Sequence, residues 1–167
     1  IYNIITGYQL ETCNELKTSV KKNIDLMMQW SVDIVQPDGQ IPLFGDSALG
    51  IAPDNAYLQK YYRQIVNTHF NEVLPSESTI VFKQDSGYAV FRDGDQYLIM
   101  DCGQLGVSYQ PGHAHCDINS FEYTYKGKRF IVDSGLSTYE DNKRRRSLRS
   151  SSAHNTVVVN NADPVSY

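Results

Sequence analysis

The spacing of the apolar residues changes once along the chain, near Pro75, and this change limits the folds that the sequence can adopt. Before Pro75, apolar residues recur every three or four positions, which is the period of a helix that buries one face. The first run ends at Pro37 and Gly39, and Asp54 and Asn55 are suited to cap a second helix. The sequence therefore predicts two helices before residue 75. The apolar stripe of the first consists of Leu10, Cys13, Leu16, Val20, Ile24, Met27 and Met28.

After Pro75 the pattern becomes that of β-strands, in which successive side chains point to opposite faces. The runs "STIVFK" and "GYAVFR" are rich in β-branched and aromatic residues, and Asp93-Gly94 is a strong hairpin signal. In "FEYTYKGKRFIVD" aromatic and polar residues alternate before a turn at Lys126-Gly127, and "HNTVVVNN" predicts another short strand over 154–161. Helices followed by strands predict an α+β protein of two units, residues 1–75 and 76–167.

Composition and charge exclude some classes of protein. The net charge of −4 argues against general nucleic-acid binding, and no run of eighteen apolar residues is present, so the sequence predicts no membrane span. The three cysteines have no metal-type spacing, and an odd number gives no disulfide framework. We therefore expect Cys13, Cys102 and Cys116 to be small buried hydrophobic residues. The chain begins at Ile1 inside a helical pattern, and we interpret it as a piece of a longer protein.

Two of the four histidines lie two positions apart, in "PGHAHCD". Residues i and i+2 of an extended backbone point to the same side, so His113 and His115 can face one site together. Asp133 ends a later strand and His154 opens the last predicted one, and antiparallel pairing can bring them to the same rim of a sheet. Two imidazoles and a carboxylate suit Zn²⁺, and Mn or Fe would also accept them. The alternatives are hydrogen-bonding surface histidines, with Asp117 either a rival ligand or a cap of its turn.

Three blocks of sequence in this region resemble one family. They are "GHAHCDINSF", a strand that ends in "VDSG", and "RSSSAHNTVVV". Together they are similar to the heparinase II/III-like polysaccharide lyases, a family that includes alginate and oligoalginate lyases. The segment "DGQIPLFGDSALG" also resembles the part that closes the helical domain of such enzymes. The matched positions are Gly112, His113, His115, Asp117, Ser120, Phe121, Val132, Asp133, Gly135, Arg149, Ser150, His154, Asn155 and Thr156.

The resemblance implies an architecture and a reaction. Family members combine an N-terminal (α/α) toroid with large antiparallel sheets, so residues 1–75 would be the last toroid helices and residues 76–167 the start of a β-sandwich domain. These lyases cleave a glycosidic bond beside a uronic acid by β-elimination. His113 matches a histidine that faces the cleft and is expected to be catalytic, by accepting the C5 proton or hydrogen-bonding the uronate; the alternative is a residue that only orients the zinc site. His115, Asp133 and His154 match the ligands of a zinc ion that organises the site rather than producing hydroxide.

The resemblance also bears on activity, location and partner. The family's catalytic tyrosine, and the Asn or His that grips the uronate, come from helices before Ile1, so residues 1–167 alone are expected to be inactive. The implied protein is bacterial, periplasmic or secreted. Its implied partner is an acidic polysaccharide or oligosaccharide, which could be heparan-like, alginate or another exopolysaccharide.

Three further residues are candidates for a role. Tyr139 follows the strand that ends at Asp133 and could supply a phenol, or pack as most tyrosines do. Arg149 lies in a matched block and is expected to bind substrate. The basic run around it, "KRRRSLR", either attracts a polyanion or is a solvated loop. His69 is expected to be an ordinary residue on a helix face.

Two other functions stay open from the sequence alone. One is a β-sandwich module that binds an acidic polysaccharide without cleaving it, for example in surface-polymer assembly, because one fold can host either role. The other is a metallohydrolase that uses zinc-bound water. A tyrosine and an Asn or His on the preceding helices would favour the lyase, and an unsaturated product would exclude the hydrolase.

Overall fold

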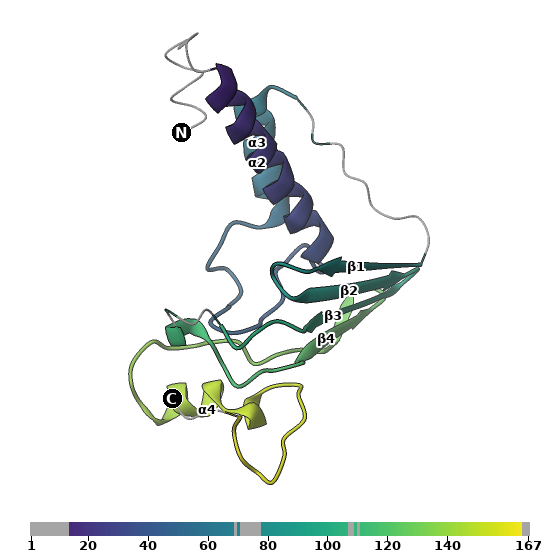
Figure 1. Cartoon of the computed structure of the whole chain (residues 1–167). Coiled ribbons are helices and arrows are strands. Elements are labelled where there is room, and N and C mark those ends of the chain that lie inside the picture. The colour runs from purple at the N-terminus through teal and green to yellow at the C-terminus, as the bar shows by residue number, and fades with distance from the viewer. Residues whose placement is uncertain (1–13, 69, 71–77, 107–108, 110, 165–167) are drawn as a thin grey trace. The chain divides into compact units, whose positions relative to one another are not determined.

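The computed structural model describes residues 14–68, 70, 78–106, 109 and 111–164 (Figure 1). The chain forms two compact units, residues 1–33 with 53–74 and residues 34–52 with 75–167. The predicted mixture of helices and antiparallel strands is confirmed. The domain boundary at residue 75 stays a prediction, and residues 34–52 belong with the sheet. Cys13 and His69 lie outside the described residues.

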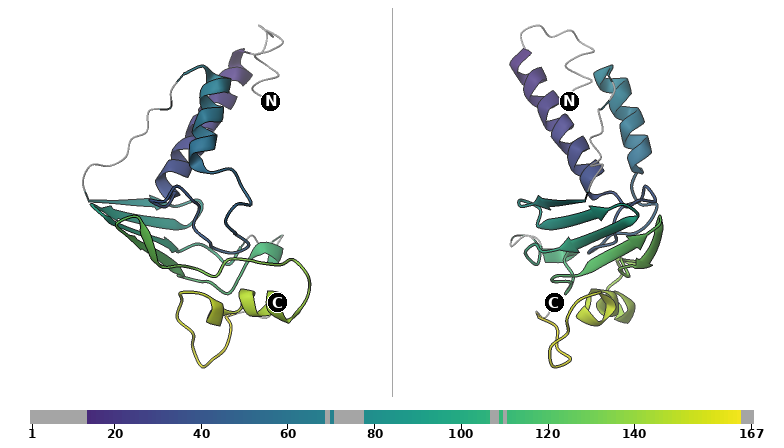
Figure 2. Two further views of the ribbon diagram at one scale, coloured as in Figure 1. Left: turned by 180° about the vertical axis from the view of Figure 1, so that it is seen from behind. Right: turned by 90° about the vertical axis from the view of Figure 1, so that its right-hand side faces the viewer.

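The first unit contains the helices α2 (Asn14–Ile34) and α3 (Asn55–Val66), which lie side by side (Figure 2). The predicted cap of the second helix is confirmed, because the Asp54 side chain accepts a hydrogen bond from the N–H of Tyr57 at 2.7 Å. The hydroxyl of Tyr62 donates to Oδ1 of Asp25 at 2.7 Å and joins the two helices. Among the described residues, no helix combines the length and the apolar character that a membrane span needs.

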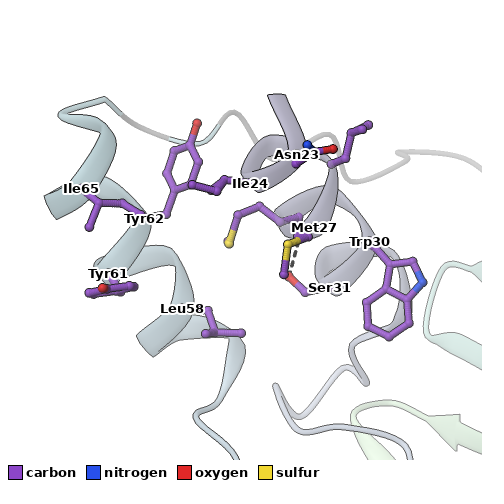
Figure 3. A pocket seen from close by; sticks show the side chains of 11 residues that line it. Asn23, Ile24, Met27, Trp30, Ser31, Leu58, Tyr61, Tyr62 and Ile65 are labelled. Atoms are coloured by element: carbon purple, nitrogen blue, oxygen red, sulfur yellow. Dashed lines mark hydrogen bonds between the residues drawn. The ribbon is translucent and has the colours of Figure 1, made fainter. Parts of the chain in front are cut away.

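An apolar groove lies between α2 and α3, and side chains of both helices line it (Figure 3). Met27 is 70% exposed there, and Leu58 and Tyr61 line the opposite wall. The groove belongs to the helical unit. Every described residue that the sequence singles out for catalysis or metal binding belongs to the second unit.

The second unit is built on a five-stranded antiparallel sheet in which strands adjacent in the sequence are also neighbours in space (Figure 1). The hairpin turns predicted at Asp93-Gly94 and Lys126-Gly127 are confirmed. The strands are β1 (Thr79–Lys83), β2 (Tyr88–Asp93), β3 (Gln96–Asp101), β4 (Phe121–Tyr125) and β5 (Lys128–Ile131).

Three short helical segments lie outside the sheet, one between β3 and β4 and two after β5. The connection from β3 to β4 contains the 3₁₀ turn η2 (Pro111–His113), and after β5 come the helix α4 (Lys143–Arg149) and the 3₁₀ turn η3 (Ser151–Ala153). The predicted strand over 154–161 is wrong, since the structure has there only one isolated bridge, between Val159 and Ala162. Val157 is 84% exposed, so a run of valines without a neighbouring strand does not form a ladder.

One face of the sheet packs against the chain that follows α2. The buried cluster is made of Ile34 and Phe44 from that segment and Val90, Tyr97 and Ile99 from β2 and β3. The Tyr97 hydroxyl donates to the backbone oxygen of Ile34 at 2.6 Å, so the buried phenol is satisfied. The segment 34–44 is therefore part of the core of the sheet unit.

Strand β4 buries its polar side chains rather than its aromatic ones. The predicted alternation is present, but Glu122 and Thr124 are fully buried, whereas Tyr125 is exposed. Oε1 of Glu122 accepts hydrogen bonds from the N–H groups of Leu43 and Asp133, each at 3.0 Å. A buried carboxylate is tolerable because these partners replace its water.

Two side chains complete this buried network. The amide of Gln36 donates to Oε2 of Glu122 and accepts from the hydroxyl of Thr124 at 2.6 Å. The guanidinium of Arg129 lies 3.5 Å from Oε2 of Glu122. The network fixes the segment after α2, and Asp133 just beyond the end of β5, relative to β4.

The opposite face of the sheet is apolar and open. Ile80 and Phe82 on β1 and Phe130 on β5 are 75%, 58% and 67% exposed. Ile80 and Phe82 point to the side opposite Val90 and Ile99, as the strand register requires. Phe130 follows Arg129, the partner of the buried Thr124, and so lies on the same open side as Ile80 and Phe82. An exposed apolar face of this kind is typical of a surface that takes part in an interaction.

We predict that Glu122→Ala lowers the free energy of unfolding by about 3–5 kcal/mol, because it leaves the Gln36 amide and two backbone N–H groups without their acceptor and removes the negative charge beside Arg129. Urea denaturation at constant slope measures the change. The control is Glu140→Ala, which removes an exposed glutamate and should shift the midpoint little. A loss under about 1 kcal/mol for Glu122→Ala would show that the network does not hold the unit together.

Candidate active site

Asp46 is the point at which both histidines of the "GHAH" motif meet. Its Oδ2 accepts a hydrogen bond from Nδ1 of His113 at 2.7 Å, and its Oδ1 accepts one from Nε2 of His115 at 2.9 Å. Arg145 of α4 donates from Nη1 to Oδ1 at 3.1 Å and from Nη2 to Oδ2 at 3.2 Å. The Asp46 side chain is 7% exposed. One nearly buried carboxylate therefore holds two histidines and an arginine.

The loop that carries Asp46 lies tightly against the chain after Asp133. The N–H of Leu136 donates to the backbone oxygen of Ser47 at 2.8 Å. Gly135 has φ of +57°, and a Cβ there would lie 2.4 Å from the same oxygen. Gly135 of the "VDSG" block is thus required by both its backbone conformation and the close approach.

His154 and Asp133 form a second, fully buried pair. Nδ1 of His154 lies 2.9 Å from each carboxylate oxygen of Asp133. The hydroxyl of Ser120 donates to Oδ2 of Asp133 at 3.0 Å. The rings of His115 and His154 lie 5.1 Å apart between their centroids. The structure therefore brings together the three residues that the sequence predicts as metal ligands.

Two buried ring nitrogens at this point have no hydrogen-bond partner among the described residues. They are Nδ1 of His115 and Nε2 of His154. A buried polar atom without a partner is costly and requires an explanation such as an ion. The described residues contain no group of three or more His, Cys, Asp or Glu side chains that already converges as a metal cage. The donor set fits zinc in its chemistry, and the ligand assignment stays a prediction.

The protonation of these groups follows from burial and from their partners. Burial favours protonated Asp46, but the hydrogen bonds from Arg145, His113 and His115 outweigh it and hold its pKa below the usual range. Burial lowers the pKa of His115, and the bond to Asp46 offsets this in part. Burial acts in the same direction on His154, but the bond and charge of Asp133 raise its pKa. His115 is thus the more readily neutral of the two, as a metal ligand requires.

His113 and His115 line a cavity of about 950 Å³ at the end of the sheet. The His113 side chain is 67% exposed, so its ring is accessible from this cavity. The lining of this cavity also contains aromatic residues and acids. The aromatic residues are Phe44, Phe82, Tyr88 and Tyr109, and the acids are Asp46, Asp85, Asp101 and Asp117.

Tyr139 and Arg149, the other predicted site residues, have different surroundings. The Tyr139 ring is 65% exposed, lies 6.2 Å from the His113 ring edge-to-face, and has the Arg145 guanidinium 5.0 Å from its centroid. Arg149 donates from Nε to the backbone oxygen of Ala114 at 3.0 Å. Arg149 therefore holds the "GHAH" loop by its backbone, and its role in substrate binding stays a prediction.

The remaining sequence expectations have mixed outcomes. Oδ2 of Asp117 accepts a hydrogen bond from the N–H of Gly45 at 3.2 Å, and its charge also acts on His115 and His154, so its role as a rival ligand stays a prediction. Cys116 is buried as predicted. The same expectation is wrong for Cys102, which follows the last residue of β3 and is exposed.

The sequence alone did not identify Asp46 or Arg145 as site residues. The segment "DGQIPLFGDSALG" resembles the family as a whole segment, but nothing in its sequence distinguishes Asp46 from Asp38 as a site residue. Arg145 belongs to a run of basic residues in which its neighbours Arg144 and Arg146 are exposed. Arg145 differs from these neighbours because it contacts Asp46, which lies 99 positions earlier in the chain.

The fold and the site together define an α+β protein with a histidine- and aspartate-rich site at the end of an antiparallel sheet. Residues 77–166 match the model of the family described as heparinase II/III-like, C-terminal. The match covers more than half of the chain, and the chain belongs to this family. Among curated proteins none matches.

Several solved structures have a similar fold. The heparinase III-BT4657 gene product has a TM-score of 0.63 at 25% identity, over 82% of this chain and 24% of its own. The heparan sulfate lyase HepC from Pedobacter heparinus has a TM-score of 0.72 at 20% identity, over 97% of this chain and 27% of its own. A heparinase III structure has a TM-score of 0.70 at 18% identity, over 97% and 30%. The chain thus spans 24–30% of the length of these proteins.

We predict that Asp101, on the cavity wall, makes the metal-free protein less stable at high pH. Burial raises its pKa to about 6, and the charges of Asp117 and Asp133 add to this, whereas the N–H of Gly103 opposes it. The folded pKa lies above the unfolded value of about 3.9, so stability is lost as the pH rises through about 6. Asp101→Asn keeps an acceptor for Gly103 and should melt above wild type near pH 8 but not near pH 4.

Thermal melts across pH test this, with Asp141→Asn as the control because that aspartate is exposed. A lower melting temperature of Asp101→Asn near pH 8 would contradict the prediction.

Proposed function

We propose that this chain is part of a polysaccharide lyase that cleaves a uronic-acid-containing polysaccharide by β-elimination. Family membership supports the class of reaction. The observation that carries the proposal is the state of His113: its Nδ1 is bound to Asp46, and its exposed ring faces a cavity with Nε2 available. A positioned imidazole of this kind is suited to accept or donate a proton.

The site must remove a proton from the substrate, protonate the leaving oxygen and stabilise the charge that develops. A base removes the C5 proton of the uronate, the electron pair forms the C4–C5 double bond, and the C4–O bond breaks as its oxygen takes a proton. We assign the proton removal, or a hydrogen bond to the uronate, to Nε2 of His113. Tyr139 remains a candidate to protonate the leaving oxygen because its ring lies next to His113. The charge that develops on the substrate must be stabilised by fixed donors.

We also propose that His115, Asp133 and His154 hold a zinc ion. The unpartnered nitrogens of His115 and His154 and the adjacent carboxylate of Asp133 support it. When bound, zinc would supply a fixed positive charge that orders these side chains. The buried position of the three groups is consistent with an organising role.

The architecture of the whole protein follows the same proposal. The apolar groove between α2 and α3 supports a toroid in which further helices cover this pair. The open apolar face with Ile80, Phe82 and Phe130 supports a β-sandwich in which a second sheet covers the first. A periplasmic or secreted location in a bacterium is part of the proposal and would bring the protein to an acidic polysaccharide.

The test of the lyase is a screen of the full-length protein against heparan sulfate, heparin, alginate and hyaluronate, read by the ultraviolet absorbance of the unsaturated product. We predict activity on at least one, and a fall in kcat of about 10²-fold or more for His113→Ala with zinc content retained. The control Asp141→Asn should keep wild-type kcat. Binding of a polysaccharide without unsaturated product would instead identify a binding module.

We predict that His115→Ala loses bound zinc and melts at a lower temperature than wild type, because a metal that binds only the folded state stabilises it. Elemental analysis and thermal melts measure both effects. The matched variant His113→Ala should retain zinc. Wild-type protein without metal after incubation with zinc would show the assignment to be wrong.

A further inference from the structure

The contacts of Asp46 determine more than the position of one histidine. A carboxylate paired with arginine through both oxygens is ionised and can only accept hydrogen bonds. Nδ1 of His113 and Nε2 of His115 must therefore both carry a hydrogen. The opposite nitrogens, Nε2 of His113 and Nδ1 of His115, are then the ones left with a lone pair when the rings are neutral.

We propose that Asp46, held by Arg145, is a positioning residue that sets the tautomer of both histidines at once, and this proposal rests on the lyase function proposed above. It makes Nε2 of His113 the nitrogen that faces the substrate and Nδ1 of His115 the nitrogen that faces the metal. The buried and unpartnered Nδ1 of His115 is the independent observation that agrees with this arrangement.

Arg145 is itself fixed, so it can fix the carboxylate. Its Nη2 donates to the backbone oxygen of Gly112 at 3.0 Å, and its backbone N–H donates to Oδ1 of Asn142, the cap of α4, at 3.0 Å. Its guanidinium also contacts the ring of Tyr139. The Arg145 guanidinium forms an ion pair with Asp46, and the Arg145 side chain is 12% exposed. Arg145 therefore acts through Asp46 rather than as a clamp on the substrate.

Asp46→Asn separates this role from simple packing. The asparagine has nearly the same volume, but it offers one accepting oxygen and one donating amide to three donors. At most one histidine can then keep both its tautomer and its hydrogen bond to residue 46. We expect kcat to fall by about 10²-fold or more and zinc affinity by about 10- to 100-fold. KM should change little, since the Asp46 side chain is nearly buried and does not reach the substrate.

The direct readout is the tautomer itself. In the zinc-loaded full-length protein with ¹⁵N-labelled histidine, two-bond ¹H–¹⁵N spectra should show a protonated Nδ1 on His113 in wild type, and a changed tautomer on one of the two histidines in Asp46→Asn. The control is Asp141→Asn, because Asp141 is an exposed carboxylate that also pairs with an arginine of α4, Arg146, at 3.0 Å. It should keep wild-type spectra, zinc content and kcat.

If Asp46→Asn does not fold, Arg145→Lys is a second variant that tests the same proposal. Lysine retains the charge but cannot bind both oxygens, so it should reduce kcat less than Asp46→Asn while leaving KM in place. Wild-type kcat and an unchanged His113 tautomer in the folded variants would overturn the proposal. If wild type gives no unsaturated product on any polysaccharide, the lyase function fails, whereas the tautomers and zinc affinity still decide the role of Asp46.

Discussion

The buried carboxylate of Glu122 is the interaction on which the rest of the sheet unit depends. A single oxygen, Oε1, accepts the N–H groups of Leu43 and Asp133, and these belong to segments 90 positions apart in the chain. Three residues after Leu43 comes Asp46, which orders His113 and His115. Asp133 itself pairs with His154. The chemistry of the site is therefore placed by a polar contact in the core. Burial raises the pKa of Glu122, and the two N–H groups and the Arg129 charge offset part of this cost.

The three histidine side chains of the site and the Arg145 side chain are each paired with a carboxylate. Each histidine of the group has a carboxylate at one ring nitrogen, Asp46 for His113 and His115 and Asp133 for His154, and this leaves the other nitrogen available. Arg145 offsets the charge of Asp46. Burial raises the pKa of Asp101 on the cavity wall to about 6, so this group carries less negative charge near pH 6 than a free aspartate, and burial shifts the pKa of Asp117 in the same direction. The cavity is thus less negative than the number of its acids suggests.

The sequence predicted what local periodicity and turn chemistry determine. The helix cap at Asp54 and the hairpins at Asp93-Gly94 and Lys126-Gly127 are local signals, and they are confirmed. The proximity of His115, Asp133 and His154 was also anticipated, because the motif spacing and the family resemblance agree. The burial of Glu122, the role of Asp46 and the absence of a strand at 154–161 depend on partners distant in the sequence. No local pattern contains that information.

The most direct test of the account is anomalous diffraction at the zinc edge from crystals of the full-length, zinc-loaded protein. The account predicts one peak bonded to His115, Asp133 and His154, with Nε2 of His113 free and Asp46 still between His113 and Arg145. A peak bonded to His113, or to residues outside this group, would contradict it.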